Sequence, residues 1–273
     1  MDLDGRAVFL HTGGVDLDPS DGVILLVHGA PDDHSVWRYQ TRWLASAGYP
    51  VAAVDLPGHG RSEGPALESV TAMAEWVIRL VEELGASKVV IVGHSMGSLI
   101  ATQAAADRPD LVEGIALVAP AQRMHVHPDL LAAAREQDPV AADLVVGWSH
   151  TGGDRFGAHL DPGVWKPAAA RRLLEKNAAV LGVDLAACSS WDGSVATQVR
   201  CRSLVVVGGR DRMTPAREGK ALAGAIAGPV VVVELAGAAH PMHYTRPEEL
   251  NTILREWLEG GEFGVGGRSQ LAG

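Results

Sequence analysis

The chain has 273 residues, 47% of them hydrophobic and 21% charged, which is the balance of an ordinary globular protein. Its formal net charge of −10 argues against binding to nucleic acid or to anionic membranes. The N-terminus lacks the basic and apolar segments of a signal peptide, and no apolar run approaches the ~18 residues that a membrane span needs.

Short apolar runs alternate with helical patterns along residues 1–119. The weakly patterned start, residues 6–20, predicts one or two edge strands. Four later runs predict buried strands, because they are too short and too β-branched for helices. These runs span residues 22–27, 50–54, 89–92 and 114–118. Helical spacing follows three of them, beginning near Ser35, near Val70 and after Gly97, and this order implies a parallel sheet with helices on both faces.

The alternation stops over residues 120–200. This stretch is alanine-rich, predicts several short helices and contains Trp148, Trp165 and Trp191. It has no strand-like run longer than a few residues. We interpret it as a helical insertion into a core that contains the sheet.

The strand pattern resumes after the insertion. Apolar runs at residues 203–208 and 229–235 predict two more strands. Thr214 is predicted to cap the helix between them, with Pro215 at its first position, and Pro247 is predicted to begin a final helix.

The domain organisation follows from these patterns. We expect a core of residues 1–119 and 201–260, an insertion of residues 120–200, and a glycine-rich, flexible tail of residues 261–273. The two cysteines of the chain are predicted to be free thiols, which suits a reducing compartment. We therefore expect a cytoplasmic protein.

One buried strand leads directly into Gly93-His94-Ser95-Met96-Gly97, after which a helical pattern begins. A serine between two glycines at a strand-to-helix corner is typical of a nucleophile elbow. The tight turn lifts the hydroxyl clear of the sheet, which requires small residues on either side. We therefore predict that Ser95 is a nucleophile.

A serine hydroxyl becomes nucleophilic only when a base takes its proton, and the base needs an acid that fixes its tautomer. Both partners are expected just past a strand, at the same edge of the sheet. Asp211 follows the strand at residues 203–208, and His240 follows the strand at residues 229–235. The order Ser95, Asp211, His240 predicts a catalytic triad.

Three other residues compete less well for these roles. Asp184 and Asp192 are acids with no strand directly before them. His243 lies three residues beyond His240 and is the rival base, but we expect it to pack beside the site.

Acyl transfer also needs two convergent donors for an oxyanion. The backbone amide of Met96 is free at the N-terminus of its helix and supplies one. The second is expected from His28-Gly29-Ala30, where the chain turns sharply after a strand and points the Ala30 amide inward.

Together these landmarks resemble the α/β-hydrolase fold superfamily over roughly residues 20–259. The matching motifs are, in chain order, His28-Gly29, Asp55-Leu56-Pro57-Gly58-His59-Gly60-Arg61-Ser62, Gly93-His94-Ser95-Met96-Gly97, Gly209-Arg210-Asp211 and Ala239-His240. The resemblance implies a mostly parallel central sheet covered by helices on both faces, with the insertion as a helical lid. One departure is Ala239, where glycine is more usual, but this exchanges one small residue for another.

The resemblance also implies a serine hydrolase that cleaves small-molecule carboxylic esters through an acyl-enzyme, with no cofactor, nucleic-acid partner or membrane partner. Carbon–carbon hydrolases of the meta-cleavage product type use the same triad and lid, and lactonases, thioesterases and cofactor-free perhydrolases also stay open as alternatives. A ligand-binding protein on a hydrolase scaffold is an alternative from another class. Haloalkane dehalogenases and epoxide hydrolases share the His-Gly-x-Pro loop but use an aspartate nucleophile, so Ser95 argues against both. The oligomeric state stays open.

The substrate pocket is the least defined part of this prediction. We expect His28 to shape the oxyanion loop, and His94 and His59 to have structural roles. Apart from the pair His125-x-His127, the insertion histidines lack the spacing of metal ligands, so no metal site is expected. The candidates for substrate binding are His28, Trp148, Trp165 and Trp191, although the tryptophans also suit packing of the insertion against the core.

Overall fold

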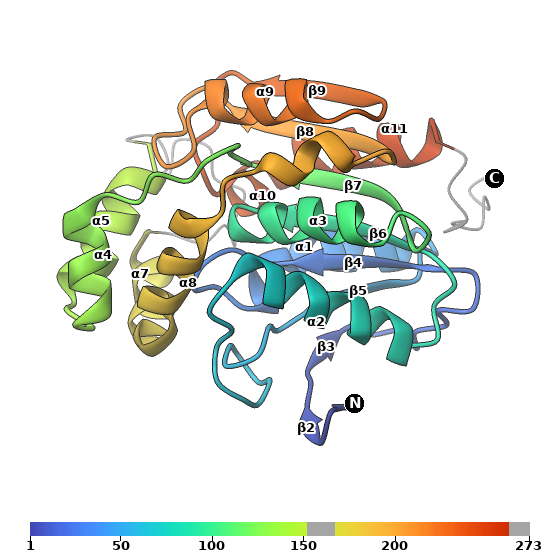
Figure 1. The fold of residues 1–273 in the computed structure, drawn as a ribbon, viewed down its shortest axis with the longest axis horizontal. Helices are drawn as coiled ribbons and strands as arrows, with labels where there is room; N and C mark the ends of the chain where they lie inside the picture. The colour runs from blue at the N-terminus through green and yellow to red at the C-terminus, as the bar shows by residue number, and fades with distance from the viewer. Residues whose placement is uncertain (152–166, 262–273) are drawn as a thin grey trace.

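The computed structural model describes residues 1–151 and 167–261. Its centre is a seven-stranded sheet with the strand order β3-β5-β4-β6-β7-β8-β9 (Figure 1). The strands are β3 (Leu10–His11), β4 (Val23–Val27), β5 (Val51–Val54), β6 (Val89–His94), β7 (Val112–Val118), β8 (Arg202–Gly208) and β9 (Val230–Leu235). β3 pairs antiparallel with β5, and the other neighbours pair in parallel. A small hairpin of β1 (Asp2–Leu3) and β2 (Arg6–Ala7) precedes this sheet.

Alternate residues of the central strands face opposite layers of the core. Along β4, Leu25 belongs to one apolar cluster, while Ile24 and Leu26 belong to the other, and all three are fully buried. Burial on both faces explains why this strand is a continuous apolar run. The edge strand β9 differs, because Val231 and Val232 remain exposed.

Two sets of helices cover the two faces of the sheet (Figure 1). α2 (Val70–Glu83), α3 (Met96–Asp107) and α9 (Ala216–Ala225) pack in one apolar cluster. The second cluster holds η1 (His34–Trp37), α1 (Arg38–Ser46), α10 (Met242–Thr245) and α11 (Pro247–Glu259). Local capping helps to begin some of these helices. At α2, for example, the Ser69 side chain accepts a hydrogen bond from the Ala72 amide.

The secondary-structure elements that the structure describes within the predicted insertion are all helices. Between β7 and β8 lie α4 (Pro128–Arg135), α5 (Val140–Ser149), α7 (Pro167–Lys176), α8 (Ala178–Ser190) and the short 3-10 helix η2 (Ser194–Gln198). Figure 1 shows α4, α5, α7 and α8 grouped together at one end of the sheet. They have a small apolar core of their own, which includes Leu130, Leu181 and Leu185. That these helices act as a lid stays a prediction.

The predicted fold class is confirmed, since the buried runs form the parallel strands and helices cover both faces. The predicted cap of α9 is wrong. This helix begins at Ala216 without a side-chain cap, and the Thr214 hydroxyl binds Asp211 instead.

Trp165 and the tail beyond residue 261 lie outside the described residues. Within the described ranges, no helix has the length and apolar character that crossing a membrane requires.

Candidate active site

Ser95 occupies a sharp corner between β6 and α3. Its backbone has φ +50°, in the left-handed region that L residues rarely adopt. The two flanking glycines are required by close backbone approach: a Cβ on Gly93 would lie 2.1 Å from the Gly97 carbonyl oxygen, and one on Gly97 would lie 2.2 Å from that of Val27. The sequence therefore forms this elbow only with hydrogen as the side chain at both positions.

The structure brings the three predicted triad residues together from three separate loops. The Ser95 hydroxyl lies 3.0 Å from His240 Nε2. On the other side of the ring, His240 Nδ1 lies 2.8 Å from Asp211 Oδ2. An Nδ1–H that donates to Asp211 leaves Nε2 free to accept the serine proton, which is the tautomer that a general base needs.

Thr214 completes the surroundings of Asp211, a role that the sequence analysis missed. Asp211 Oδ1 accepts from the amides of Met213 and Thr214 at 2.8 and 2.9 Å, and Oδ2 lies 2.8 Å from the Thr214 hydroxyl. Burial alone would raise the pKa of Asp211, but the charge of His240 and these hydrogen bonds outweigh it and lower that pKa below its usual value. The carboxylate therefore stays ionised beside His240.

The two predicted oxyanion donors occupy suitable elements. Met96 is the first residue of α3, so its amide has no acceptor within the helix. Ala30 lies in the loop after β4 and lines the same cavity as Ser95. In the described part of the chain neither amide has a hydrogen-bond acceptor. Their use as an oxyanion hole stays a prediction.

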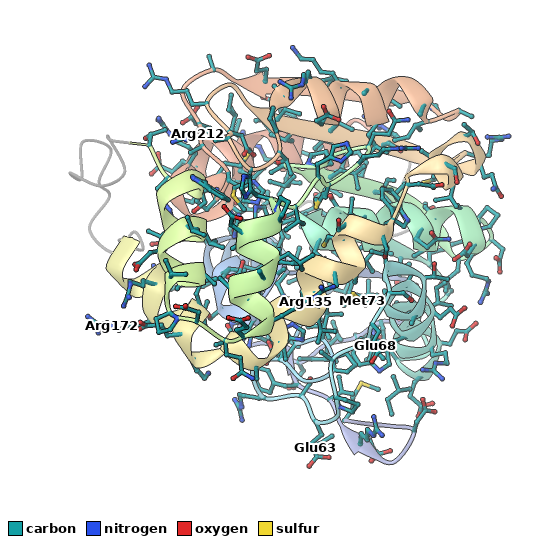
Figure 2. The ribbon with its side chains drawn as sticks, turned by 60° about the vertical axis from the view of Figure 1, so that its left-hand side comes forward. Glu63, Glu68, Met73, Arg135, Arg172 and Arg212 are labelled. Carbon is teal, nitrogen blue, oxygen red and sulfur yellow. The ribbon has the colours of Figure 1, made fainter. Side chains whose placement is uncertain are left out.

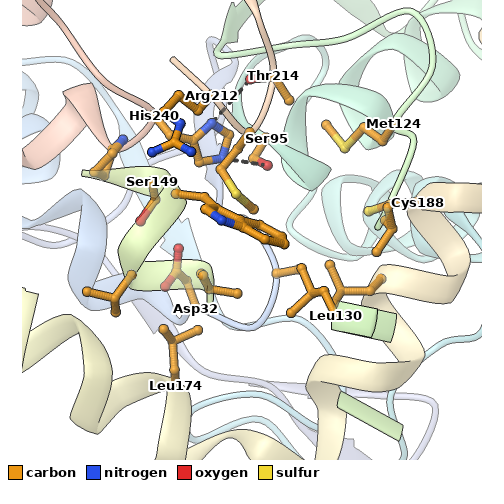
Figure 3. Close-up of a pocket in the computed structure, with 18 of the residues that line it drawn as sticks. Asp32, Ser95, Met124, Leu130, Ser149, Leu174, Cys188, Arg212, Thr214 and His240 are labelled. Atoms are coloured by element: carbon orange, nitrogen blue, oxygen red, sulfur yellow. Dashed lines mark hydrogen bonds between the residues drawn. The ribbon is translucent and has the colours of Figure 1, made fainter. Parts of the chain in front are cut away.

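A cavity of about 350 Å³ opens beside Ser95 and His240 (Figure 3). The core contributes one side of it, and the insertion helices α4, α5, α7 and α8 contribute the other. The insertion also touches the triad directly, because the His240 amide donates to the Ser149 carbonyl at 3.2 Å. The walls are mainly apolar, as a small-molecule site requires.

Of the four candidate substrate-binding residues, Trp148 lines this cavity. The expectation that His28 binds substrate is wrong, because its ring is fully buried away from the cavity, with Nδ1 2.9 Å from the Gly29 carbonyl and Nε2 accepting from the Leu56 amide. It therefore braces the oxyanion loop. These contacts agree with the other expectation for His28, that it shapes this loop. Trp191 is also wrong as a pocket residue, since it packs in the core and donates its indole N–H to Gln103. Trp165 is not among the described residues.

The other histidines near the site do not reach Ser95 in the way His240 does. His94 Nε2 lies 3.1 Å from the His240 carbonyl, and burial, with the nearby charge of His240, lowers the pKa of His94 to about 3. His243 is fully buried, and its ring stacks on that of His94 with the centroids 4.0 Å apart. Its position matches the expected packing role.

Two groups among the described side chains have the composition of a cation site, and one of them borders the cavity. Ligand atoms of Asp32, His94 and His243 lie within 4.8 Å of one another. Among the described residues, His94 Nδ1 and both ring nitrogens of His243 have no hydrogen-bond partner. Asp32 was not singled out from the sequence, and its place in the cavity wall depends on how the loop after β4 folds over Ser95.

The comparisons with known proteins agree on one fold. Residues 22–151 match the family model described as alpha/beta hydrolase fold. The enol-lactonase from Burkholderia xenovorans superposes with a TM-score of 0.81 and 24% identity over 94% of this chain and 98% of that one. A thermophilic esterase from Thermogutta terrifontis, solved with malate bound, gives a TM-score of 0.77 and 26% identity over 93% and 94%.

Curated relatives match over two different lengths. The (E)-2-((N-methylformamido)methylene)succinate hydrolase of Acinetobacter baylyi is 28% identical over 86% of this chain and 90% of that protein. The acetyltransferase component of the acetoin cleaving system from Cupriavidus necator is 40% identical, and epoxide hydrolase 3 from Siraitia grosvenorii is 34% identical, over 44% and 41% of this chain. The matched stretch spans only 31% and 36% of those two proteins.

Proposed function

Residues 22–151 match the alpha/beta hydrolase family model and the fold agrees with it, and from this premise we propose that the chain is a serine hydrolase of that superfamily that cleaves carboxylic esters through an acyl-enzyme. The observation that carries the proposal is the continuous hydrogen-bond chain from Ser95 Oγ through the His240 ring to Asp211. It ends in a carboxylate that hydrogen bonds keep ionised. Because the proposed nucleophile is a serine, we do not propose epoxide hydrolysis, which uses an aspartate nucleophile.

In the proposed reaction, Ser95 Oγ attacks the ester carbonyl while His240 Nε2 takes the hydroxyl proton. Asp211 stabilises the imidazolium that forms. His240 then gives the proton to the leaving alcohol, and the acyl group remains on Ser95. Water, deprotonated by His240, attacks the acyl-enzyme, and the return of the proton to Ser95 releases the acid.

The amides of Ala30 and Met96 are proposed to bind the oxyanion of each tetrahedral intermediate. Loss of one such donor typically costs about 10²–10³ in rate. One amide lies in a loop whose His28 side chain contacts the Gly29 carbonyl and the Leu56 amide, and the other lies at the start of α3. Such preorganised donors stabilise the developing charge without reorganising during the reaction.

The cavity supports a small ester as substrate, because about 350 Å³ lies at the lower end of the range for small-molecule sites. The compound named for the Acinetobacter relative, a substituted succinate, is of that size class. The similarity to a thermophilic esterase supports ester cleavage in particular. We propose that the insertion, residues 120–200, covers the cavity as a lid.

Hydrolysis of p-nitrophenyl esters from acetate to palmitate tests this function, with wild type measured beside Ser95→Ala. We expect turnover of short esters and its loss by at least about 10³-fold in the variant, because the nucleophile is absent. An unchanged melting temperature shows that the variant is folded. Labelling of wild type with a fluorophosphonate, followed by mass spectrometry, identifies the reactive serine independently of the substrate.

The outcomes separate the two parts of the proposal. Labelling at Ser95 without turnover of any ester would overturn the ester assignment but keep the nucleophile. Turnover that survives in Ser95→Ala, or a label at another residue, would overturn the mechanism.

A further inference from the structure

The cavity differs in charge from the rest of the chain. The protein has 33 acidic and 23 basic residues, which gives its net charge of −10. Among the described residues that line the cavity, however, there is one arginine, Arg212, and one carboxyl, Asp32, together with five histidines. Arg212 therefore gives one region of this mainly apolar cavity a positive charge, opposite in sign to the net charge of the protein, and such a region attracts anions locally.

Asp32 does not cancel this local positive charge. Burial, together with the nearby charge of Asp33, raises the pKa of Asp32 well above its ordinary value, which favours the neutral acid. Asp32 also lies toward the opposite end of the cavity from Arg212 in Figure 3. Arg212 is therefore the permanent charge of the described cavity wall.

Arg212 lines the cavity close to the triad, where its side chain could contact a bound ligand. It directly follows Asp211 in the loop after β8, and Figure 2 shows it where that loop approaches the insertion helices. Figure 3 places its guanidinium at the same end of the cavity as His240. Within residues 1–151 and 167–261, no hydrogen bond or ion pair of this side chain is found, whereas Arg108 and Arg171 each contact two carboxylates.

We propose that the substrate carries a carboxylate, which Arg212 binds at the mouth of the cavity while Ser95 attacks the ester. A guanidinium presents a planar fork of donors that matches a carboxylate. The substrate class is therefore a small monoester or lactone of a carboxylic acid that keeps a second, free carboxylate. This inference rests on the proposed ester hydrolysis for its reaction, but anion binding by Arg212 can be measured without it.

Esters matched in length and differing in charge test the proposal. On the acyl side, mono-4-nitrophenyl glutarate is compared with 4-nitrophenyl pentanoate. On the alcohol side, 4-pentanoyloxybenzoate is compared with phenyl pentanoate. We expect wild type to favour the anionic member of at least one pair in kcat/KM. Arg212→Gln should reduce that preference roughly tenfold, the effect of losing one charge-assisted hydrogen bond near solvent.

Arg210 provides a matched control. It lies in the same loop, is exposed, and does not line the cavity. Arg210→Gln changes the net charge by the same amount, so we expect it to leave the preference unchanged. Arg212→Lys should recover part of the preference, because it restores the charge without the planar fork.

Binding distinguishes this inference from the proposed function. In a Ser95→Ala background, calorimetry with glutarate should show binding that Arg212→Gln weakens and Arg210→Gln does not. If no ester is hydrolysed but this pattern appears, the proposed reaction fails and the carboxylate site stands. Equal effects of Arg212→Gln and Arg210→Gln, or a preference of wild type for a choline ester over its neutral counterpart, would overturn the carboxylate site.

Discussion

At the scale of single residues, Thr214 shows how the triad depends on a neighbour that does not react. Its hydroxyl lies 2.8 Å from Asp211 Oδ2 and 2.9 Å from the Ala119 carbonyl oxygen, so its one proton has two acceptors. Its amide donates to the other oxygen of Asp211. In the sequence, Thr214 directly before Pro215 indicates a helix cap, although it also lies three residues after Asp211. A threonine just before a helix can bind either the backbone of that helix or a nearby carboxylate, and the local sequence is the same in both cases.

We predict that Thr214→Val lowers kcat for ester hydrolysis by roughly tenfold or more, because one hydrogen bond to a charged group contributes about 1.5–3 kcal/mol. Thr214→Ser keeps the hydroxyl and should retain a kcat near that of wild type.

The charge of His240 and the hydrogen bonds lower the pKa of Asp211 in the folded protein. Ionised Asp211 therefore stabilises the fold at any pH above its unfolded pKa, and this contribution is lost as the pH falls through its folded pKa.

The valine variant should therefore lose stability at a higher pH than wild type on acid titration. Melting temperatures between pH 3 and pH 7 measure this shift. If the melting temperatures of the valine and serine variants fell equally as the pH is lowered, the hydroxyl would not act on Asp211.

At the scale of elements, a buried pair joins the insertion to the core. His59, in the loop between β5 and α2, lies 2.9 Å from Asp184 of α8, and both side chains are almost completely buried. His59 Nδ1 lies 3.0 Å from the Pro57 carbonyl oxygen, so Nδ1 carries a proton and Nε2 shares a second one with Asp184. This contact bridges 125 positions of the chain and ties the middle of α8 to the loop between β5 and α2.

We predict that Asp184→Ala lowers the free energy of unfolding by about 3–5 kcal/mol, because it leaves His59 without its buried partner. Burial alone would lower the pKa of His59, but Asp184 raises it above the usual value. The stabilisation is therefore fully present below the unfolded pKa of histidine and is lost as pH rises through the folded pKa.

Asp184→Asn isolates this pH effect, since an amide can still donate to neutral His59. The difference in unfolding free energy between wild type and Asp184→Asn should be largest near pH 6 and shrink toward pH 9. Urea denaturation at several pH values measures it. A difference that is constant across this range would mean that no shared proton stabilises the pair.

At the scale of the whole molecule, the insertion contains a second cavity of about 220 Å³ next to the one at Ser95. Leu174 of α7 and Leu181 of α8 line both cavities. These two side chains therefore form part of the wall between them. The volume available to a substrate depends on how the insertion packs over the core.

We predict that Leu174→Ala shifts the preferred acyl chain of p-nitrophenyl esters toward longer chains, because the two cavities become joined. The variant should also lose about 2–3 kcal/mol of stability, the lower end for a buried leucine, since its side chain already borders empty space.

Leu173→Ala is the matched control, because Leu173 is buried in the core cluster and lines neither cavity. It should lower stability without changing the preferred chain length. An identical chain-length profile for both variants would contradict a dividing wall.

The sequence by itself determined the sheet and the order of the triad, because both depend on local patterns. Apolar runs with helical segments between them specify a parallel sheet, and Ser95, Asp211 and His240 each lie just beyond a strand whose end is visible in the sequence. Parallel strands then bring these ends to one edge. The glycine pattern of the elbow is likewise visible in the sequence, although only the Gly93 requirement is local: a Cβ there would meet the Gly97 carbonyl oxygen, whereas a Cβ on Gly97 would meet that of Val27 on the neighbouring strand.

Only the tertiary structure decided which side chains meet inside the cavity. Trp191 binds Gln103, which is 88 positions away, and the sequence holds no sign of that partner. The His28 side chain is buried in the core and not in the cavity, where the sequence predicts it. Asp32, from the same loop, lines the cavity instead. A loop of a few residues can direct either side chain inward, and the choice depends on packing against distant segments. Burial and long-range contacts, which local propensities do not encode, therefore decide the lining of the cavity.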